Sequence, residues 1–224
     1  MASEAILSDA RSEVLQRIRR AIGASSVDAA VVSAEWDALP REYKRKGTLE
    51  REAVLEMLED RLRDYDASVV RAKAGGVSAA IAKFLTERGK QRLVVPKGLA
   101  EALGEALPTG FDFVVDEALG IDELDGVEGV LTASTVAIAE TGTIVLQNVP
   151  GQGRRAPTLV PDYHLCVVCA EDVTETVPEA MKRLAATAKL STTFFSGPSA
   201  TADIEMTRIK GVHGPRFLDV ILVA

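Results

Sequence analysis

The sequence has few of the residues that usually carry metal or redox chemistry. Its 224 residues include two cysteines and two histidines. An iron–sulfur cluster needs about four thiolate ligands, so these two cysteines cannot hold one by themselves. The histidines, His164 and His213, lie far apart in the chain and do not form a metal-ligand spacing such as H-E-x-x-H. We therefore expect no metal site and no iron–sulfur cluster in this chain.

The two cysteines are spaced as C-V-V-C, which also occurs in redox pairs and metal sites. Here Cys166 and Cys169 lie in the apolar run YHLCVVCAEDV, whose β-branched residues predict a buried strand. Residues three apart in a strand point to opposite faces, so the two sulfur atoms cannot meet or share a metal ion. The sequence thus favours core packing for both cysteines over a redox role.

The sequence also lacks an excess of basic residues and a long apolar run. Lys and Arg number 26 against 33 Asp and Glu, a net charge of −7 that argues against nucleic acid as the main partner. No run approaches the ~18 apolar residues of a membrane helix, so we expect no membrane insertion. The N-terminal segment contains Glu4, Asp9 and Glu13 and lacks the apolar region of a signal peptide. A cytoplasmic location is the expectation that follows.

The sequence does contain an alternation of short β-rich runs and helical segments. Two helices are predicted first, at about 3–22 and 48–64. From Ala67 onward, β-rich runs at 68–72, 92–96 and 111–115 are separated by helical segments at 75–88 and 98–106. This alternation indicates a parallel sheet covered by helices. We predict an N-terminal helical extension, residues 1–66, and one α/β domain, residues 67–224, with a mostly parallel sheet and helices on both faces.

The second half of the α/β domain carries the polar turns. Residues 130–147 read as two strands around a hairpin-like turn at 140–143. Further strands are predicted at 163–169, 191–196 and 217–223, with a helix at about 177–189. In open parallel sheets, ligands bind beyond the carboxyl ends of the strands. We therefore expect the functional site among the turn at 140–143, the loop at Arg154–Arg155 and the segment 196–201.

The segment 196–201, Ser-Gly-Pro-Ser-Ala-Thr, lies between a predicted strand and a predicted helix. Glycine permits close backbone approach, and hydroxyls and a helix N-terminus attract anions. The segment lacks the lysine and the glycine spacing of a Walker motif. It can equally be a tight turn in which Ser199 or Thr201 caps the helix and Asp203 stabilises its dipole. The sequence leaves the ligand loop and the capped turn open.

Three further candidates carry ionisable groups. Glu140, fixed in a turn with Gly142, can serve as a nucleophile, a general base or a ligand for hydroxyls, or it can simply decorate the turn. The pair Arg154–Arg155 suits a carboxylate or phosphate, although its Gly/Pro-rich surroundings favour a solvated surface loop. His213 lies in a glycine-rich loop and is the better acid/base candidate of the two histidines.

Taken together, several of these segments closely resemble the LUD domain of the lactate-utilisation protein C family. The resemblance rests on TASTVAIAETGTIVL, GPSATADIEMTRIKGVHGP and the final LDVILV, and extends to LPREYKRKG and to the arginine loop ending in LVPDYHLCVV. It covers most of the chain in the same order. It implies a fold like that of glucosamine-phosphate deaminase, ribose-phosphate isomerase and coenzyme A transferases. It also implies a role in oxidising L-lactate to pyruvate as one component of a three-protein complex.

The resemblance assigns candidate site residues by position. Its glutamate-threonine-glycine motif falls on Glu140, Thr141 and Gly142, followed by Thr143. Its serine-glycine turn, acidic helix and closing turn fall on Ser196, Gly197, Ser199, Thr201, Asp203, Glu205, Gly211, His213, Gly214 and Pro215. We expect Glu140 and His213 to be catalytic candidates. We expect ligand contacts from Thr141, Gly142, Thr143, Arg154, Arg155, Ser196, Gly197, Ser199, Thr201, Asp203, Glu205 and Gly214.

The leading functional expectation is a component of an L-lactate oxidation system that itself holds no iron–sulfur cluster. Partner subunits would hold the clusters, and this chain would bind a small carboxylate, a nucleotide-like ligand or its partners at the strand-end cleft. The alternative is a stand-alone transferase or isomerase of the coenzyme A transferase-like fold that uses Glu140. A folate cycloligase-like enzyme finds less support, because no lysine-bearing phosphate loop follows a strand. A scaffold that docks partners through helices 3–22 and 48–64 is the fourth possibility.

Overall fold

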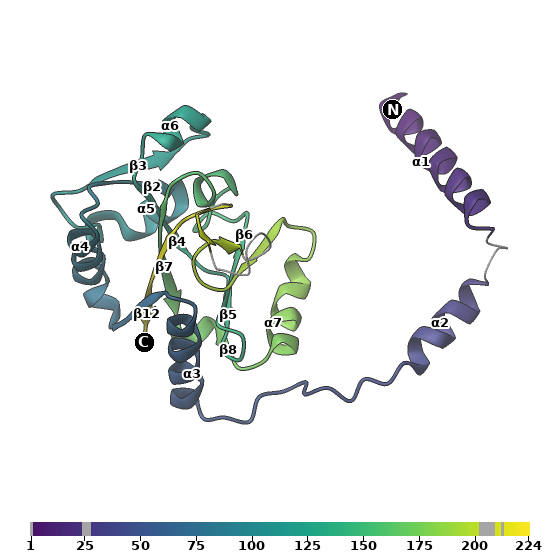
Figure 1. The fold of residues 1–224 in the computed structure, drawn as a ribbon, viewed down its shortest axis with the longest axis horizontal. Coiled ribbons are helices and arrows are strands. Elements are labelled where there is room, and N and C mark those ends of the chain that lie inside the picture. Colours follow the sequence, from purple (N-terminus) through teal and green to yellow (C-terminus); the bar gives the residue numbers. More distant parts are fainter. Residues whose placement is uncertain (1, 24–27, 202–208, 212) are drawn as a thin grey trace. The chain divides into compact units, whose positions relative to one another are not determined.

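The computed structural model describes residues 2–23, 28–201, 209–211 and 213–224 (Figure 1). The chain divides into two compact units, Met1–Tyr43 and Lys44–Ala224. The sequence predicted a boundary at residue 66 instead. The difference concerns helix α3, Arg51–Asp64, whose apolar side chains Val54, Leu55, Leu58 and Leu62 are buried in the core of the second unit.

The first unit consists of two helices, α1, Ala2–Ala21, and α2, Ala29–Ala38. Asp28 caps α2 by accepting a hydrogen bond from the backbone N–H of Ala30 at 2.9 Å. The guanidinium of Arg41 lies over the Trp36 ring, 5.0 Å from its centre. Trp36 is 64% exposed, and none of the residues of α2 is buried. Among its described residues, this unit therefore forms no hydrophobic core.

The second unit is built on a six-stranded sheet in which every neighbouring pair runs parallel (Figure 1). This confirms the predicted parallel α/β fold. The runs at 68–72 and 92–96 became strands with the predicted bounds, because both are short, apolar and rich in β-branched residues. In sheet order the strands are β1 Ser68–Ala72, β12 Phe217–Val223, β7 Tyr163–Cys169, β4 Gly129–Ala133, β2 Arg92–Pro96 and β3 Asp112–Asp116.

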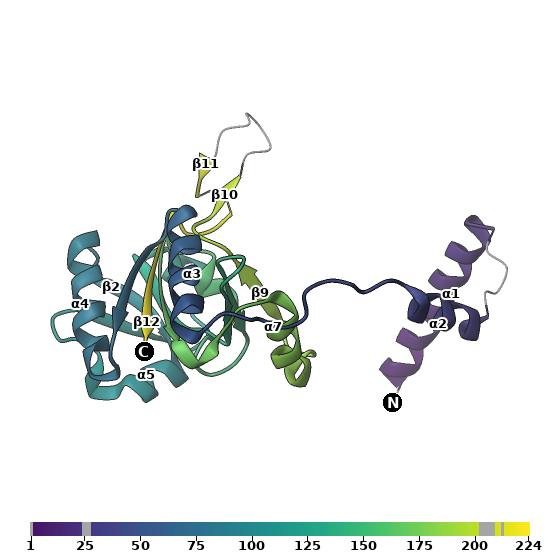
Figure 2. The ribbon, with the colours of Figure 1, turned by 90° about the horizontal axis from the view of Figure 1, so that it is seen from below.

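Helices cover both faces of this sheet, as the sequence predicted (Figures 1 and 2). Helices α4, Val77–Arg88, and α5, Lys97–Leu103, pack on one face, and α3 packs on the other. Strand β7 shows the alternation, because Leu165 contacts the α4 side whereas Cys166 and Val168 contact the α3 side. The short helix α6, Ile121–Asp125, lies between β3 and β4 in the chain. In the described part of the chain, no helix combines the length and the apolar character needed to cross a membrane.

A second, four-stranded sheet lies against α3. Its order is β8 Val173–Thr174, β5 Val136–Ile138, β6 Thr143–Gln147 and β9 Thr192–Phe195. Ala137 and Ile144 pack with α3, and Val136 and Val145 pack with helix α7, Val177–Leu184. The strands β5 and β6 confirm the hairpin predicted around 140–143. Helix α7 ends at Leu184, earlier than predicted, and a 3-10 turn follows at Ala185–Thr187.

The segment after β9 differs from its prediction. Ala200–Thr201 forms a short strand, β10, that pairs antiparallel with β11, Ile209–Lys210, where the sequence predicted the start of a helix (Figure 2). Thr201 lies in that strand and so is not a helix cap. The backbone N–H and C=O groups of this segment form hydrogen bonds to the strand that contains Ile209, and not within a helix. Asp203 and Glu205, two of the predicted site residues, lie outside the described residues.

Candidate functional site

Five of the predicted site residues line one cavity of about 260 Å³. We call it the histidine pocket. The predicted residues are Arg155, Ser196, Gly197, Ser199 and His213, and the structure adds His164 and Thr158. A single cavity thus collects residues from the arginine loop, from the serine-glycine turn and from the closing glycine-rich turn.

The pocket lies at the other end of the main sheet from the one expected. His164 is the second residue of β7, and His213 precedes β12, so the pocket lies by the amino ends of these strands. The sequence correctly placed Ser196 after a strand. However, that strand is β9, which pairs antiparallel with β6 in the small sheet. Ser196 lines the same cavity as His164, and it is this shared cavity that places it by the amino ends of the main strands.

His164 is a buried imidazole that the sequence did not select. Its residue is 4% exposed, and its Nε2 atom lies 2.8 Å from the hydroxyl oxygen of Thr132. Burial, together with the positive charge of Arg155, lowers the pKa of His164 from 6.5 to about 3. The imidazole is therefore neutral at physiological pH. His164 was not selected from the sequence because it lies within an apolar strand. The local pattern there does not distinguish a functional histidine from one that is only packed in the core.

Arg155 contributes the positive charge of the pocket. Its Nη1 atom donates to the carbonyl oxygen of Thr158 at 3.0 Å and to the Thr158 hydroxyl at 2.6 Å. Burial lowers the pKa of Arg155, and no carboxylate of the described residues forms an ion pair with it. Arg155 is exposed as a residue, but its guanidinium has no counter-charge among the described residues, so the pocket is suited to an anion.

Backbone contacts join the two loops that form the pocket's mouth. The N–H of Ser199 donates to the carbonyl oxygen of Pro215 at 2.8 Å, and the N–H of His213 donates to the Ser199 hydroxyl at 3.2 Å. Gly214 lies against the Ser199 side chain: a Cβ added at Gly214 would lie 3.5 Å from the Cβ of Ser199. The serine-glycine turn and the closing turn are thus held together by backbone and side-chain hydrogen bonds.

A chain of hydroxyls links the serine-glycine turn to the turn at 140–143. The hydroxyl oxygens of Thr141 and Thr143 lie 2.7 Å apart, and Thr143 lies 2.7 Å from the Ser196 hydroxyl. Gly142, with φ +57°, packs against Arg61, and a Cβ there would lie 2.8 Å from the Arg61 Cβ. Helix α3 therefore holds this turn beside the serine segment.

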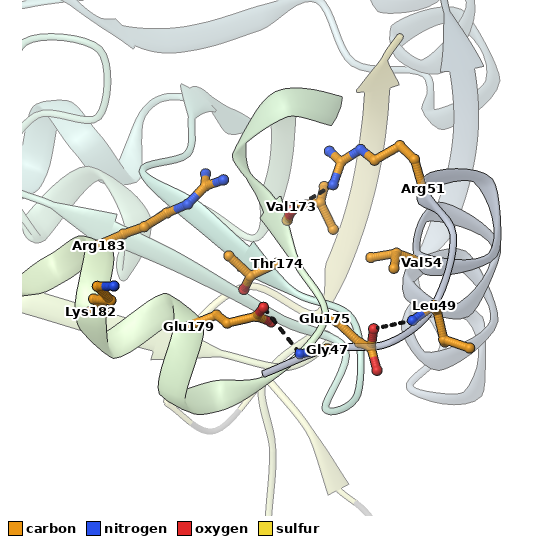
Figure 3. Close-up of a pocket in the computed structure, with 10 residues that line it drawn as sticks. All are labelled: Gly47, Leu49, Arg51, Val54, Val173, Thr174, Glu175, Glu179, Lys182 and Arg183. Carbon is orange, nitrogen blue, oxygen red and sulfur yellow. Dashed lines mark hydrogen bonds between the residues drawn. The ribbon is translucent and has the colours of Figure 1, made fainter. Parts of the chain in front are cut away.

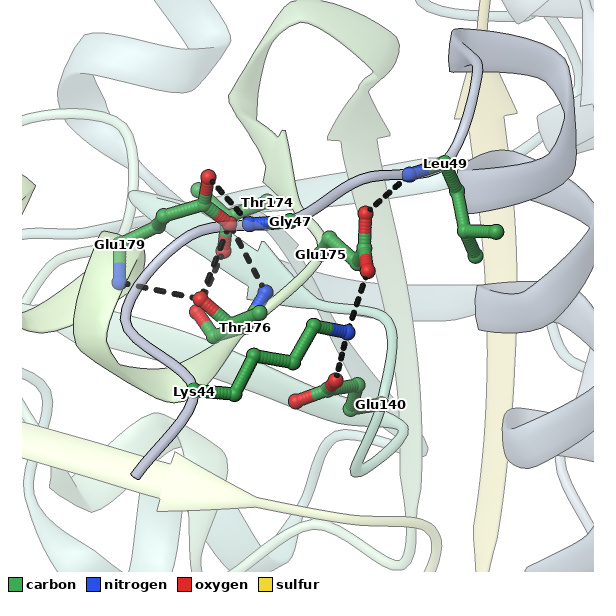
Figure 4. A network of polar contacts seen from close by, with 8 residues as sticks. All are labelled: Lys44, Gly47, Leu49, Glu140, Thr174, Glu175, Thr176 and Glu179. Carbon is green, nitrogen blue, oxygen red and sulfur yellow. Dashed lines mark hydrogen bonds and ion pairs between the residues drawn. The ribbon is translucent and has the colours of Figure 1, made fainter. Parts of the chain in front are cut away.

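Glu140 itself belongs to a different cluster (Figure 4). Its carboxylate accepts from the Lys44 Nζ at 2.7 Å, and the same Nζ lies 2.5 Å from the Glu175 carboxylate. Hydrogen bonds to Glu140 and then Glu175 raise the pKa of Lys44. Glu140 does not line the histidine pocket. The alternative that uses Glu140 as a nucleophile therefore concerns a carboxylate that pairs with Lys44 and lies outside the histidine pocket.

The segment before α3 is fastened to the small sheet around this cluster (Figure 4). The backbone N–H of Leu49 donates to Glu175 at 2.8 Å, and that of Gly47 donates to Glu179 at 3.1 Å. A Cβ at Gly47 would overlap a carboxylate oxygen of Glu175, so only glycine fits there. Glu179 also forms a capping box with Thr176 at the start of α7.

The side chain of Arg154 forms an ion pair with a carboxylate, although Arg154 and Arg155 together line a further small cavity. Its Nε and Nη2 atoms lie 2.9 and 2.8 Å from the two carboxylate oxygens of Asp116, the last residue of β3. Arg154 lines a separate cavity of about 430 Å³ beside the carboxyl ends of β2 and β3. The two arginines therefore do not act as one fork. Both side chains make protein contacts, although Arg155 is an exposed residue and Arg154 is half-buried.

Comparison with known proteins places the chain in a family. Residues 121–223 match the family model described as the LUD domain. The chain is 41% identical over 218 residues to lactate utilization protein C from Deinococcus radiodurans, with 96% of each chain covered. It is 27% identical to lactate utilization protein C from Bacillus pumilus over 223 residues, with 92% of each chain covered.

A solved structure shows the same fold. The crystal structure of a DUF162 family protein from Deinococcus radiodurans superposes with a TM-score of 0.69 at 39% identity. The match covers 79% of this chain and 100% of the other. Together with the sequence relatives, it shows that this chain belongs to the lactate utilization protein C family and carries its LUD domain.

Proposed function

We propose that the protein acts in lactate utilisation, as a component of an L-lactate oxidation system, and that the histidine pocket binds a small carboxylate. The family relationship supports the first part, since the relatives are named lactate utilization protein C. The observation that carries the second is Arg155, a guanidinium without a carboxylate partner among the described residues, in a cavity with two histidines. The cytoplasmic location expected from the sequence is part of this proposal.

The pocket offers a suitable partner for each polar group of a 2-hydroxy acid. The guanidinium of Arg155 suits the carboxylate, with Ser196 and Ser199 able to donate further hydrogen bonds. His213 can accept the proton of the hydroxyl group, whereas the neutral His164, whose pKa is about 3, can only form a hydrogen bond with it. A volume of about 260 Å³ suits a small acid better than a larger, drug-sized ligand. L-Lactate and its product pyruvate both match this description.

Oxidation of lactate to pyruvate releases two electrons and two protons, and the electrons need an acceptor. We propose that iron–sulfur clusters in partner subunits receive them. Burial raises the pKa of the Cys166 thiol to about 12, which disfavours the thiolate that a cluster requires. Cys169 lies on the other face of β7 and is exposed. We therefore expect the purified chain to remain free of a cluster after incubation with iron and sulfide, which absorbance near 400 nm will check.

Binding and growth measurements test the proposal together. Isothermal titration of the wild-type chain with L-lactate and pyruvate should show binding, and Arg155→Gln should weaken it at least tenfold. Arg92→Gln is the matched control, because Arg92 is exposed and pairs only with Asp112 in the described residues. Thermal unfolding will confirm that the variants fold. If Arg155→Gln binds both acids as tightly as the wild type, the pocket assignment is wrong.

The cellular test concerns the role in lactate utilisation. A strain that lacks the gene should fail to grow on L-lactate and grow normally on pyruvate. The wild-type and Arg92→Gln genes should restore growth on L-lactate, and the Arg155→Gln gene should not. Normal growth of the deletion strain on L-lactate, with no second copy of the gene, would refute the proposed function.

A further inference from the structure

A larger cavity lies apart from the histidine pocket and shares none of its lining residues. Its volume is about 670 Å³, and it is bounded by the start of α3, by β8 and by α7 (Figure 3). Three cationic side chains line it: Arg51, Lys182 and Arg183. We call it the arginine pocket. The sequence did not single out any of these three residues.

Arg51 and Arg183 approach one another from different helices. Figure 3 shows their guanidinium groups extending toward each other across β8, Arg51 from α3 and Arg183 from α7. Arg51 donates to the carbonyl oxygen of Val173 at 2.7 Å, and Arg183 donates to that of Glu171 at 3.0 Å. Backbone carbonyls thus fix both guanidiniums in place while leaving most of their N–H groups free of protein acceptors in the described residues.

The positive charge of this pair is only partly neutralised. The carboxylate of Asp172 lies 3.7 Å from Arg183, and both side chains are partly exposed. No carboxylate of the described residues lies within ion-pair distance of Arg51. Burial, followed by the charge of Arg183, lowers the pKa of Arg51. The two guanidiniums therefore repel each other, and a bound anion would relieve that repulsion.

The carboxylates inside the pocket are already committed to other groups. Glu175 accepts from the backbone of Leu49 and pairs with Lys44, and Glu179 accepts from Gly47 and caps α7. Figure 3 shows both glutamates near Gly47, away from the arginine pair. The remaining wall is apolar, with Val54 and Val173. The pocket therefore has a cationic end and an apolar side. At its other end lie two carboxylates that already have hydrogen-bond partners within the protein.

We propose that the arginine pocket binds a phosphate-bearing small molecule, with the phosphate group between Arg51 and Arg183. A phosphate monoester carries nearly two negative charges and three acceptor oxygens, which suits two guanidiniums and a lysine better than a single carboxylate does. The volume lies within the range of pockets that enclose metabolite- and cofactor-sized ligands. The apolar wall can contact the rest of the molecule. This site is independent of the carboxylate proposed for the histidine pocket.

Titration of the complete chain with inorganic phosphate, pyrophosphate and ADP tests this site. We expect all three to bind, with affinity falling as salt concentration rises. Arg51→Gln and Arg183→Gln should each weaken binding at least tenfold. Arg61→Gln is the matched control, because Arg61 lies on the same helix as Arg51 but pairs with Asp60 and Asp64. Its affinities should equal those of the wild type.

Three results would overturn the proposal. One is the absence of binding of all three probes to the wild-type chain. Another is unchanged affinity in a folded Arg51→Gln or Arg183→Gln variant, and if one variant fails to fold the other decides. The third is binding of the dicarboxylate succinate in place of the phosphate probes. The phosphate probes are compared in Arg51→Gln and Arg183→Gln, and the 2-hydroxy acids in Arg155→Gln, so failure of the histidine-pocket assignment remains distinguishable from failure of this one.

Discussion

The ammonium nitrogen of Lys44 lies 2.5 Å from a carboxylate oxygen of Glu175, whose side chain is only 4% exposed. Lys44 belongs to the segment that precedes α3, and Glu175 follows β8, so the pair joins chain segments that are far apart in sequence. Lys44 also pairs with Glu140 at 2.7 Å. A single lysine therefore compensates two carboxylates and holds the segment before α3 on the small sheet.

Replacing Lys44 with methionine should destabilise the protein in a pH-dependent way. Hydrogen bonding to Lys44 is the largest cause that lowers the pKa of Glu175 below its ordinary value of 4.5. A carboxylate with a lowered folded-state pKa contributes stability above its unfolded pKa and loses it as pH falls through the folded value. The stability gap between wild type and Lys44→Met should thus be widest near neutral pH and close below about pH 4.

Urea unfolding at a series of pH values will measure this gap. Lys46→Met is the matched control, because it removes the same charge from the same segment and leaves the contacts of Lys44 intact. Equal losses of stability in the two variants would show that net charge, and not the Lys44–Glu175 pair, accounts for the effect.

The main sheet was predictable from sequence because its strands carry their own signal. Strands β1, β2, β7 and β12 are short apolar runs rich in β-branched residues, and their predicted bounds match the structure closely. Helix α3 was also predicted, but its place in the core was not. Its pattern shows an apolar face without showing which surface covers that face.

The candidate site was harder to predict, because it depends on contacts between distant segments. The hydroxyl contact between Thr143 and Ser196 follows from the pairing of β6 with β9, which no local pattern specifies. Arg154 and Arg155 are adjacent in sequence, yet Arg154 pairs with Asp116 whereas Arg155 lines the histidine pocket. His164 resembles any histidine in an apolar strand until its contact with Thr132 is known. The sequence therefore predicted which segments form the site, but it did not predict which of their side chains contact one another.

Gly197→Ala should cost more stability than Gly89→Ala, although both glycines have positive φ angles, +82° and +62°. A side chain in this conformation costs about 1–2 kcal/mol, and we expect that loss for Gly89→Ala, where nothing lies within 4 Å. At Gly197 the added Cβ would lie 2.5 Å from the Tyr65 Cβ and 2.7 Å from its carbonyl oxygen. The clash should add roughly 1–3 kcal/mol.

Chemical unfolding of the two glycine variants provides the comparison. The excess loss in Gly197→Ala measures the close contact between the serine-glycine turn and the end of α3. Equal losses would mean that the turn does not rest on Tyr65, and would contradict the position of Ser196 in the histidine pocket.

His164 should make the protein less stable as pH falls from 7.5 to 5. Its pKa is about 3 in the folded protein and about 6.5 when unfolded, so the unfolded chain binds a proton in this window that the folded chain does not. Stability therefore rises with pH here, by about 2 kcal/mol between pH 5 and 7.5 from this group alone. His164→Gln should remove that part of the slope.

Unfolding free energies at pH 5 and 7.5 will test the role of His164. The window lies above the ordinary pKa of carboxylates, which limits their contribution. His213 is present in both proteins and so affects both slopes alike. A wild-type slope identical to that of His164→Gln would show that His164 takes up a proton in the folded state.

Neutralising Asp219 should cost more stability than neutralising a partly exposed carboxylate with the same kind of arginine partner. Asp219 is fully buried in β12, where Arg88 contacts its two oxygens at 2.9 and 2.6 Å and the Tyr163 hydroxyl donates at 3.0 Å. Asp219→Asn keeps the shape of the side chain but leaves the partly buried Arg88 without its counter-charge. Removing one partner of a buried pair costs about 3–5 kcal/mol, and we expect a loss near the lower end because Arg88 is 28% exposed.

Asp162→Asn is the control for this buried pair. Asp162 also binds its arginine through both oxygens, at 2.6 and 2.7 Å from Arg216, but its side chain is 34% exposed and that of Arg216 is 57% exposed. Because solvent screens that pair, its loss should be much smaller than that of Asp219→Asn in urea unfolding. Similar losses in the two variants would contradict the assignment, since the hydrogen-bond geometry is alike and burial is the main difference between them.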